Sequence, residues 1–230
     1  NMAKMEDKAQ AARALYEHAE ALGADFLPYV EPSMSELIPL IAFQYSSEVR
    51  STCAQAAAAV FNCACLSDNL DLARDYLPVL ALALCKQTES EKTDDMDVVY
   101  AFADALSDTL YFAYRQLSDE NATLVSKFSV ELGQSIVGIL MRLMVACLSR
   151  RAELVCSLHG ANGDLSGEDE KKEIENSLNK EQEVLTPLVD SIGYTLKFLK
   201  EAFLPIFDAD VAPILGPYLG ESPDTRARFA

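Results

Sequence analysis

Hydrophobic residues recur along most of the chain at the three- and four-residue spacing of an amphipathic helix. Four stripes are clear, and they run through Ala12–Leu22, Val49–Ala64, Val99–Ala113 and Leu185–Leu199. No sustained alternation of apolar and polar residues, bounded by turn signals, predicts a strand. The pattern therefore predicts an all-α fold, with helices near residues 3–22, 33–44, 47–66, 69–87, 95–116, 127–155, 172–200 and 207–219.

A proline motif recurs within this helical pattern. Phe26–Val30 (Phe-Leu-Pro-Tyr-Val) matches Phe203–Phe207 (Phe-Leu-Pro-Ile-Phe), and Tyr76–Val79 is a looser third copy. We interpret each proline as standing near the start of the second helix of a pair, where the first N–H groups have no helical partner. Pro28 and Pro205 lie 177 residues apart.

A second landmark repeats at almost the same distance. A short acidic turn precedes Arg50, and a similar turn precedes Arg226, 176 residues later. This offset fits four helical hairpins of about 44 residues, or three with long inserts, and both lie in the size range of HEAT-type repeats. Such hairpins stack because one alone cannot bury its apolar face.

Residues 1–230 are therefore expected to form a single HEAT-repeat α-solenoid of about four repeats, with an acidic inserted loop at about 160–183. Terminal repeats of a solenoid need polar caps. Both ends of this chain look like cuts, so we expect a segment of a longer solenoid.

The charge is strongly negative. Lys and Arg number 19 against 36 Asp and Glu, which gives a net charge of −17 and a pI near 4.4. Such a surface repels phosphate backbones and anionic lipid, so we expect no nucleic-acid or membrane partner and instead a basic protein. The longest apolar stretch, Ile136–Leu148, is interrupted by Arg142 and is too short to span a bilayer.

Few residues offer catalytic or metal-binding chemistry. The chain has two histidines, no glycine-rich phosphate loop, and six cysteines that lie mostly in apolar runs. Cys156 and His159 stand three apart at a helix end, which we interpret as a frayed terminus rather than a nucleophile and its base. We expect no enzyme, no cofactor and no metal; the alternative, an α-helical enzyme, would require a cleft holding carboxylates of shifted pKa.

Two groups of residues had both a structural and a functional interpretation. The aromatic residues of 100–114 are interpreted as packing between repeats rather than as a ligand cage; they are Tyr100, Phe102, Tyr111, Phe112 and Tyr114. The acidic run Glu168, Asp169 and Glu170 is either an attractor for basic cargo or a solvated segment that leads into a helix.

The ordered series of landmarks resembles the importin-β superfamily of nuclear transport receptors, and within it the importin-five-like branch. The resemblance rests on Phe26–Pro32, Leu37–Ile41 and Glu48–Ala54, followed by the acidic insertion Gly163–Glu183 and then by Phe203-Leu204-Pro205 and Ser222–Arg226. It covers nearly the whole chain and places it after the middle of a receptor.

The resemblance implies a receptor that carries basic cargo such as ribosomal proteins and histones, touches FG nucleoporins, and releases cargo on binding Ran-GTP. It also implies a shuttling protein of cytoplasm and nucleus, which we expect to be monomeric. The second helices of such hairpins line the concave side, so the candidate cargo-binding acids are Glu36, Asp71, Asp75, Glu131, Glu168, Asp169 and Glu170.

Two other functions remain open. The chain could belong to a HEAT-repeat scaffold of another assembly, of the phosphatase or vesicle-coat type. It could also be a structural spacer that holds other repeats at the right curvature.

Overall fold

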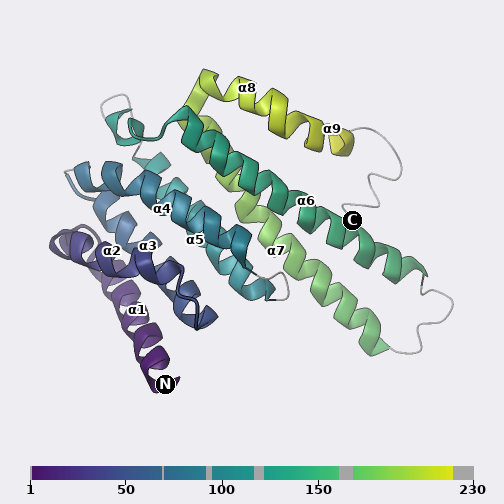
Figure 1. Cartoon of the computed structure of the whole chain (residues 1–230), viewed down its shortest axis with the longest axis horizontal. Helices are drawn as coiled ribbons and strands as arrows, with labels where there is room; N and C mark the ends of the chain where they lie inside the picture. Colours follow the sequence, from purple (N-terminus) through teal and green to yellow (C-terminus); the bar gives the residue numbers. More distant parts are fainter. Residues whose placement is uncertain (1, 69, 92–94, 117–121, 161–167, 220–230) are drawn as a thin grey trace.

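The structure, a computed structural model, describes residues 2–68, 70–91, 95–116, 122–160 and 168–219, and these residues form helices without any strand (Figure 1). The prediction of an all-α fold is thereby confirmed. The α-helices are α1 (Met2–Leu22), α2 (Leu27–Ile41), α3 (Ser47–Cys65), α4 (Asp71–Ser90), α5 (Met96–Arg115), α6 (Val130–Gly160), α7 (Glu168–Leu199), α8 (Leu204–Ile206) and α9 (Ala212–Leu219). Shorter turns are the 3₁₀ segments η1 (Gly23–Phe26), η2 (Ala122–Val125) and η4 (Lys200–Phe203) and the π-helical turn η5 (Phe207–Val211).

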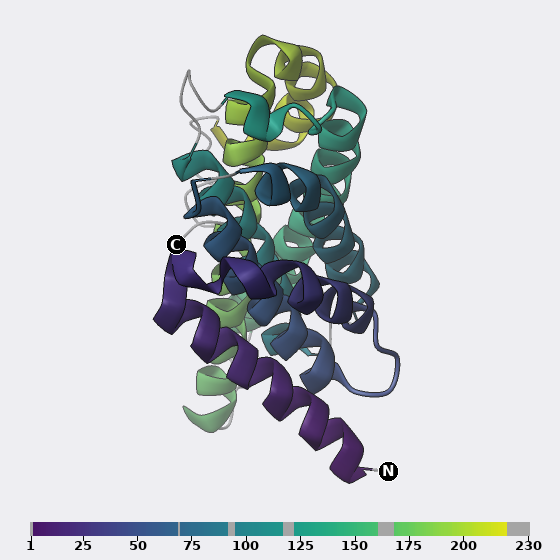
Figure 2. The ribbon, with the colours of Figure 1, turned by 90° about the vertical axis from the view of Figure 1, so that its left-hand side faces the viewer.

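The helices lie in two rows (Figures 1 and 2). In the first row α1 packs on α3, α3 on α5, and α5 on α7. In the second row α2 packs on α4, α4 on α6, and α6 on η5. Each second-row helix also packs on the first-row helix that follows it, so α2 meets α3, α4 meets α5, and α6 meets α7.

The alanine-rich helix α3 occupies the middle of the N-terminal half. Its residues Ala56, Ala57, Ala58 and Ala59 are all buried, and Phe61 is fully enclosed. Because alanine side chains are short, neighbouring helices approach α3 closely on several sides. Most of the cysteines serve the same packing as small apolar residues: Cys53, Cys63, Cys65, Cys85 and Cys147 are buried, whereas Cys156 is exposed.

The same backbone connection joins α1 to α2 and α7 to α8. Each begins with a residue in the left-handed region, Gly23 at φ 53° and Lys200 at φ 51°, and continues through a 3₁₀ turn. Pro28 and Pro205 then stand in the first turn of the following helix. Both pairs are 177 residues apart, so the recurrence in the sequence is also a recurrence in the backbone.

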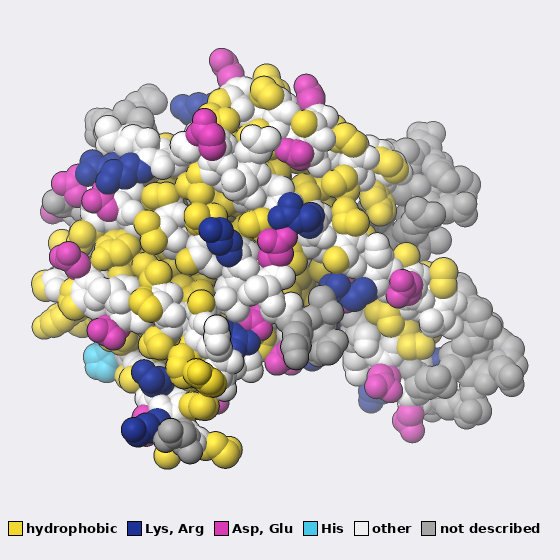
Figure 3. All heavy atoms as spheres, viewed as in Figure 1, with side chains coloured by type: hydrophobic (Ala, Val, Ile, Leu, Met, Phe, Trp, Pro, Cys, Tyr) yellow, Lys and Arg dark blue, Asp and Glu magenta, His cyan; other side chains and the backbone are white. Residues whose placement is uncertain are grey.

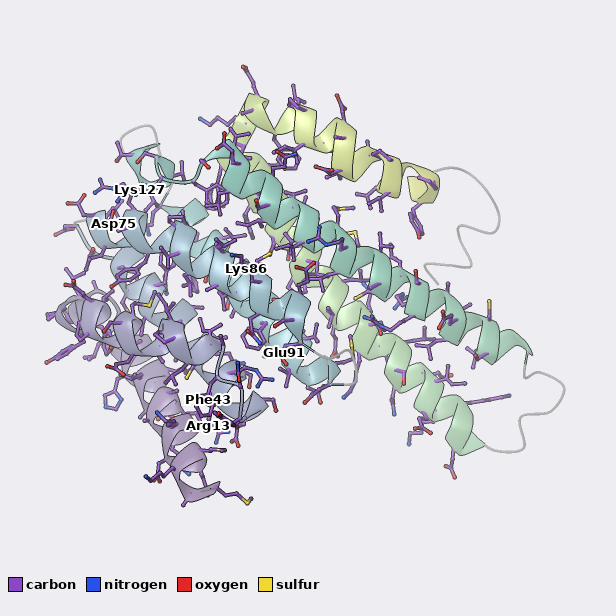
Figure 4. The ribbon with its side chains drawn as sticks, in the orientation of Figure 1. Arg13, Phe43, Asp75, Lys86, Glu91 and Lys127 are labelled. Atoms are coloured by element: carbon purple, nitrogen blue, oxygen red, sulfur yellow. The ribbon has the colours of Figure 1, made fainter. Side chains whose placement is uncertain are left out.

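Arg50, the arginine after the first acidic turn, links the turn between α2 and α3 to the end of α4. Arg50 donates from Nε and one Nη atom to both carboxylate oxygens of Glu91 at 2.6 and 2.7 Å, and from the other Nη atom to the carbonyl oxygen of Phe43 at 3.0 Å. Figure 4 labels the two acceptor residues, Phe43 and Glu91. The side chains of Arg50 and Glu91 are 15% and 7% exposed. The turn between α2 and α3 is thus fastened to the end of α4; the matching Arg226 lies outside the described residues.

Three expectations about individual segments were wrong. Helix α2 begins at Leu27 rather than near 33, because Pro28 fits the first turn and the helix continues through Pro32. Pro78 lies in the interior of α4 instead of near its start. The acidic insertion is not a loop over its described part, because residues 168–183 form the first half of α7.

Helix α6 combines great length with an apolar composition. Within the part of the chain that the structure describes, Val130–Leu158 is the one segment long and apolar enough to cross a membrane by length and composition. Its buried residues, among them Ile136, Val137 and Leu140, pack between α4 and α7. Packing against these helices accounts for that apolar side of α6.

Candidate functional site

The acids predicted from the sequence do not form one site. Glu36 lies exposed on α2, Asp71 and Asp75 near the start of α4, Glu131 in the first turn of α6, and Asp169 exposed near the start of α7. Only Asp71 and Asp75 come together. The side chains of Glu168 and Glu170 lie outside the described residues.

Nearby cations and hydrogen-bond donors already engage several of these acids. Arg74 contacts Asp71 at 2.8 Å and Asp75 at 3.4 Å, and Lys127 contacts Asp75 at 2.7 Å (Figure 4). The hydrogen bond from Lys127 is the main reason that the pKa of Asp75 is lowered. The pKa of Glu131 is lowered by its own backbone N–H and then by the Ser129 hydroxyl.

The face of the second row therefore carries charges of both signs. Figure 3 shows dark-blue and magenta side chains interspersed on it, among many yellow ones. Arg142 on α6 meets Glu89 on α4 at 2.7 Å, a further example of local neutralisation. A basic partner would have to compete with these internal cations.

A different group of acids gathers on the first row, along one strip of α5. The stripe that includes Phe102, Leu106 and Leu110 is buried against neighbouring helices. The opposite strip, at spacings of three and four residues, remains at the surface: Tyr100, Asp104, Ser107, Asp108 and Tyr111.

One side of this strip borders a cavity of about 280 Å³. Helix α1 contributes Tyr16 and Glu20 to its wall, and the alanines of α3 form part of its lining. The full lining is Tyr16, Glu20, Gln55, Ala58, Ala59, Asp104, Ala105, Asp108 and Phe112.

The other side of the strip borders a cavity of about 400 Å³ between α5 and α7. Asp104 and Asp108 line this cavity as well, so the strip separates two cavities that share a wall. The full lining is Tyr100, Asp104, Ser107, Asp108, Tyr111, Glu183, Thr186, Pro187, Asp190 and Tyr194. We call the two cavities together the tyrosine–carboxylate groove.

The carboxylates of the groove repel one another. Burial raises the pKa of Asp108 to about 6, with further contributions from Asp104 and Glu20. Burial also raises the pKa of Asp104, although a hydrogen bond from the Tyr100 hydroxyl at 3.5 Å opposes the shift. Among the described residues that line the two cavities, none carries a positive charge.

Tyrosine rings continue beyond the groove and hold cations of the chain itself. Tyr194 lies 5.8 Å from Tyr111 and 5.6 Å from Tyr114, measured between ring centroids. The Nζ atom of Lys197 sits 4.1 Å above the Tyr114 ring and 5.0 Å from the Tyr194 ring, and Arg115 lies over Tyr111. The negative faces of these rings thus attract an ammonium and a guanidinium group.

This arrangement is suited to binding a cation. Half-buried carboxylates concentrate negative potential in a concave surface, and tyrosine rings provide faces for a lysine or arginine side chain. No group of three or more His, Cys, Asp or Glu side chains in the described part of the chain is placed to hold a metal ion. The buried thiols stay protonated because burial raises their pKa, to about 12 for Cys85 and Cys147 and about 11 for Cys53.

The sequence alone did not indicate this groove. The interpretation of the aromatic residues as packing between repeats holds for Phe102, which is fully buried, and also for Tyr111 and Tyr114, whose rings contact Tyr194 of α7. These two tyrosines and Tyr100 nevertheless stay 36–38% exposed and reach the surface. The spacing of Tyr100, Asp104 and Asp108 was a usable signal, since it marks one exposed face of a helix. The acids that α1 and α7 add could be found only from the packing of the helices.

Comparison with known proteins adds no relative. No family model matches the chain, and a search of curated proteins finds no match to it.

Proposed function

We propose that the chain is a non-catalytic, protein-binding segment of a nuclear import receptor of the importin-β type, which takes up a basic polypeptide segment in the tyrosine–carboxylate groove. Binding there would use charge complementarity and the faces of the tyrosine rings. The observation that carries this proposal is the pair Asp104 and Asp108, half-buried in a groove whose described lining has no cation. The groove thus replaces the second-row acids as the candidate surface for basic cargo.

The arrangement of the helices supports a HEAT-type solenoid of four hairpins. The helices can be paired in chain order as α1 with α2, α3 with α4, α5 with α6, and α7 with the segment α8–α9. This pairing gives two parallel rows, as stacked hairpins do. The connection repeated at Gly23 and Lys200 supports the same division. Because the sequence resembles the importin-five-like branch, we propose that this solenoid is part of a receptor of that branch.

In the proposed receptor, Ran-GTP and FG nucleoporins would act through the full-length protein, and the receptor would shuttle between cytoplasm and nucleus as a monomer. The net charge of −17 supports a basic protein as cargo and disfavours nucleic acid and anionic membrane.

The receptor hypothesis has a direct test. The 230-residue chain and the longer receptor proposed to contain it would be titrated with a fluorescent histone-tail peptide at low and high salt, with and without Ran-GTP. We expect salt-sensitive binding to both, and displacement from the longer receptor by Ran-GTP. If the longer receptor binds the peptide but Ran-GTP does not displace it, the result would instead support a HEAT scaffold of another assembly. If neither the 230-residue chain nor the longer receptor binds the peptide, the spacer interpretation is left.

One observation favours a second candidate, an acid–base enzyme. The carboxylates of shifted pKa, Asp104 and Asp108, form the kind of pair that such an enzyme requires. The two candidates differ in what occupancy does to Asp108: a bound lysine or arginine would lower its pKa because the charges attract. An NMR titration of the Asp108 side chain with and without the peptide separates them, since an unchanged pKa would argue against the binding function.

A further inference from the structure

A second concave surface lies between α1 and α2, the first helices of the two rows (Figure 1). It is a cavity of about 740 Å³, and its described lining comes only from α1, η1 and α2. Most of this lining is apolar, and its larger side chains are Leu15, Leu22, Phe26, Tyr29 and Pro32. We call this cavity the α1–α2 groove.

The α1–α2 groove presents few polar groups and much apolar surface. Its one carboxylate among the described lining residues is Glu36, which is exposed. The Nδ1 atom of His18 lies 2.5 Å from the carbonyl oxygen of Ala14, one turn earlier in the same helix. Leu22 and Tyr29, by contrast, are 45% and 57% exposed. An apolar surface of this kind suits the apolar stripe of a helix.

In each later hairpin, a helix of this chain packs against both helices of the pair. Helix α2 packs on α3 and α4, α4 packs on α5 and α6, and α6 packs on α7 and η5. In all three cases this helix directly precedes the first-row helix of the pair in the sequence. The pair α1 and α2 has no such helix among the described residues. The α1–α2 groove therefore continues an interface that the chain already forms three times.

Burial along the first row supports this equivalence. Helix α3, which α1, α2 and α5 flank, buries residues around its whole circumference, including the run 56–61. Helix α1 buries only alanines, while a second stripe at helical spacing, which includes Leu15 and Leu22, lines the α1–α2 groove. A helix that precedes α1 would cover this second stripe as α2 covers α3.

We propose that the α1–α2 groove is an intramolecular docking site for an amphipathic helix that directly precedes α1 in the longer protein and runs antiparallel to it. The direction follows from α2, which a short turn joins to α3 and which packs on it. The docked helix would place large apolar side chains against Ala11 and Ala14 and a lysine or arginine near Glu36. This inference rests on the proposal that the chain is a segment of a longer receptor, but not on cargo binding.

Thiol protection tests the proposal. Ala11→Cys places a thiol in the α1–α2 groove, and Glu17→Cys places one at an exposed position of α1 outside the groove. Both variants also carry Cys156→Ser, because Cys156 is the exposed cysteine of the described residues. Alkylation is followed by mass spectrometry in the 230-residue chain and in the longer receptor. We expect the Ala11→Cys thiol to react at least tenfold more slowly in the longer receptor, and the Glu17→Cys thiol to react equally in both.

Equal rates for the Ala11→Cys thiol in the two proteins would overturn the proposal. Protection that appears in the 230-residue chain alone and grows with its concentration would assign the groove to a second copy instead. A photo-crosslinking amino acid in place of Glu36, in the longer receptor, identifies the occupant: a crosslink directly upstream of residue 1 is expected, and one to any other segment contradicts the assignment. No cargo peptide is present, so protection of the thiol together with no binding of the histone-tail peptide would contradict the proposed function alone.

Discussion

At the scale of single residues, the molecule contains two contrasting carboxylates. Glu91 is held by Arg50 and by the Gln87 side chain, and although burial alone would raise its pKa, these hydrogen bonds lower it. Asp108 has burial without a compensating cation, and its pKa is raised to about 6. The first carboxylate stabilises the fold at neutral pH, and the second destabilises it.

Asp108 gives a pH-dependent expectation. Because its pKa is raised in the folded state above the ordinary value of 3.8, the folded chain binds more protons between about pH 4 and 6. The stability cost of Asp108 is therefore present at pH 7 and disappears as the pH falls towards 4. We expect Asp108→Asn to raise the free energy of unfolding by about 1 kcal/mol at pH 7, after allowance for screening by solvent, and by almost nothing near pH 4. Urea unfolding at the two pH values measures this, and a stability gain that does not depend on pH would contradict the assigned cause.

The Arg50–Glu91 pair gives an expectation of the opposite sign. Arg50→Met leaves Glu91 buried without its cation and frees the Phe43 carbonyl, so we expect a loss of about 3 kcal/mol in the free energy of unfolding. The matched control is Arg13→Met, which breaks an exposed pair with Glu48 and should cost less than about 1 kcal/mol. Similar losses for both variants in urea unfolding would show that burial of the Arg50 pair does not matter.

At the scale of secondary-structure elements, the connection that begins at Gly23 and Lys200 is the most distinctive feature. The left-handed conformation costs a side-chain-bearing residue about 1 kcal/mol relative to glycine. The chain uses glycine at the first position and lysine at the second, although both take nearly the same φ. The connection is thus maintained by the packing around it rather than by the residue at its start.

This asymmetry leads to a paired expectation. Lys200→Gly should raise the free energy of unfolding by up to about 1 kcal/mol, because it removes the strain at φ 51°. Gly23→Ala should lower it by about the same amount, since a Cβ atom there meets only Leu66 at 3.7 Å and the cost is conformational. Thermal unfolding of the two variants compares them directly; destabilisation by Lys200→Gly would contradict the view that this residue is strained.

Helices α3 and α5 were predicted within a residue or so of their observed ends, because their apolar stripes are long and punctuated by polar turns. Helix α2 was placed too late, near residue 33, although Pro28 was interpreted as standing near a helix start; the observed helix begins at Leu27 and runs through Pro32. Periodicity locates a buried face but does not decide whether a proline begins, interrupts or accompanies a helix.

At the scale of the whole molecule, ion pairs join helices in both rows, including Arg13–Glu48 and Lys180–Asp97 in the first, whereas the described residues that line the groove include no Lys or Arg. On the second row, acids such as Asp75 are matched by cations of neighbouring helices. On the first row, α1, α5 and α7 bring Glu20, Asp104, Asp108 and Glu183 to a common groove. These residues are dispersed over more than 160 positions of the chain, so their convergence could not be predicted before the order of packing was known.

The measurement that tests the central claim most directly is peptide binding by two variants that each lose two negative charges. Asp104→Asn/Asp108→Asn removes the shared wall of the tyrosine–carboxylate groove, and Glu36→Gln/Glu131→Gln removes two of the acids first predicted from the sequence. With a basic histone-tail peptide at low salt, we expect at least a tenfold loss of affinity for the groove variant and less than a twofold loss for the second-row variant. The opposite order, or equal losses in both variants, would contradict the assignment of binding to the groove.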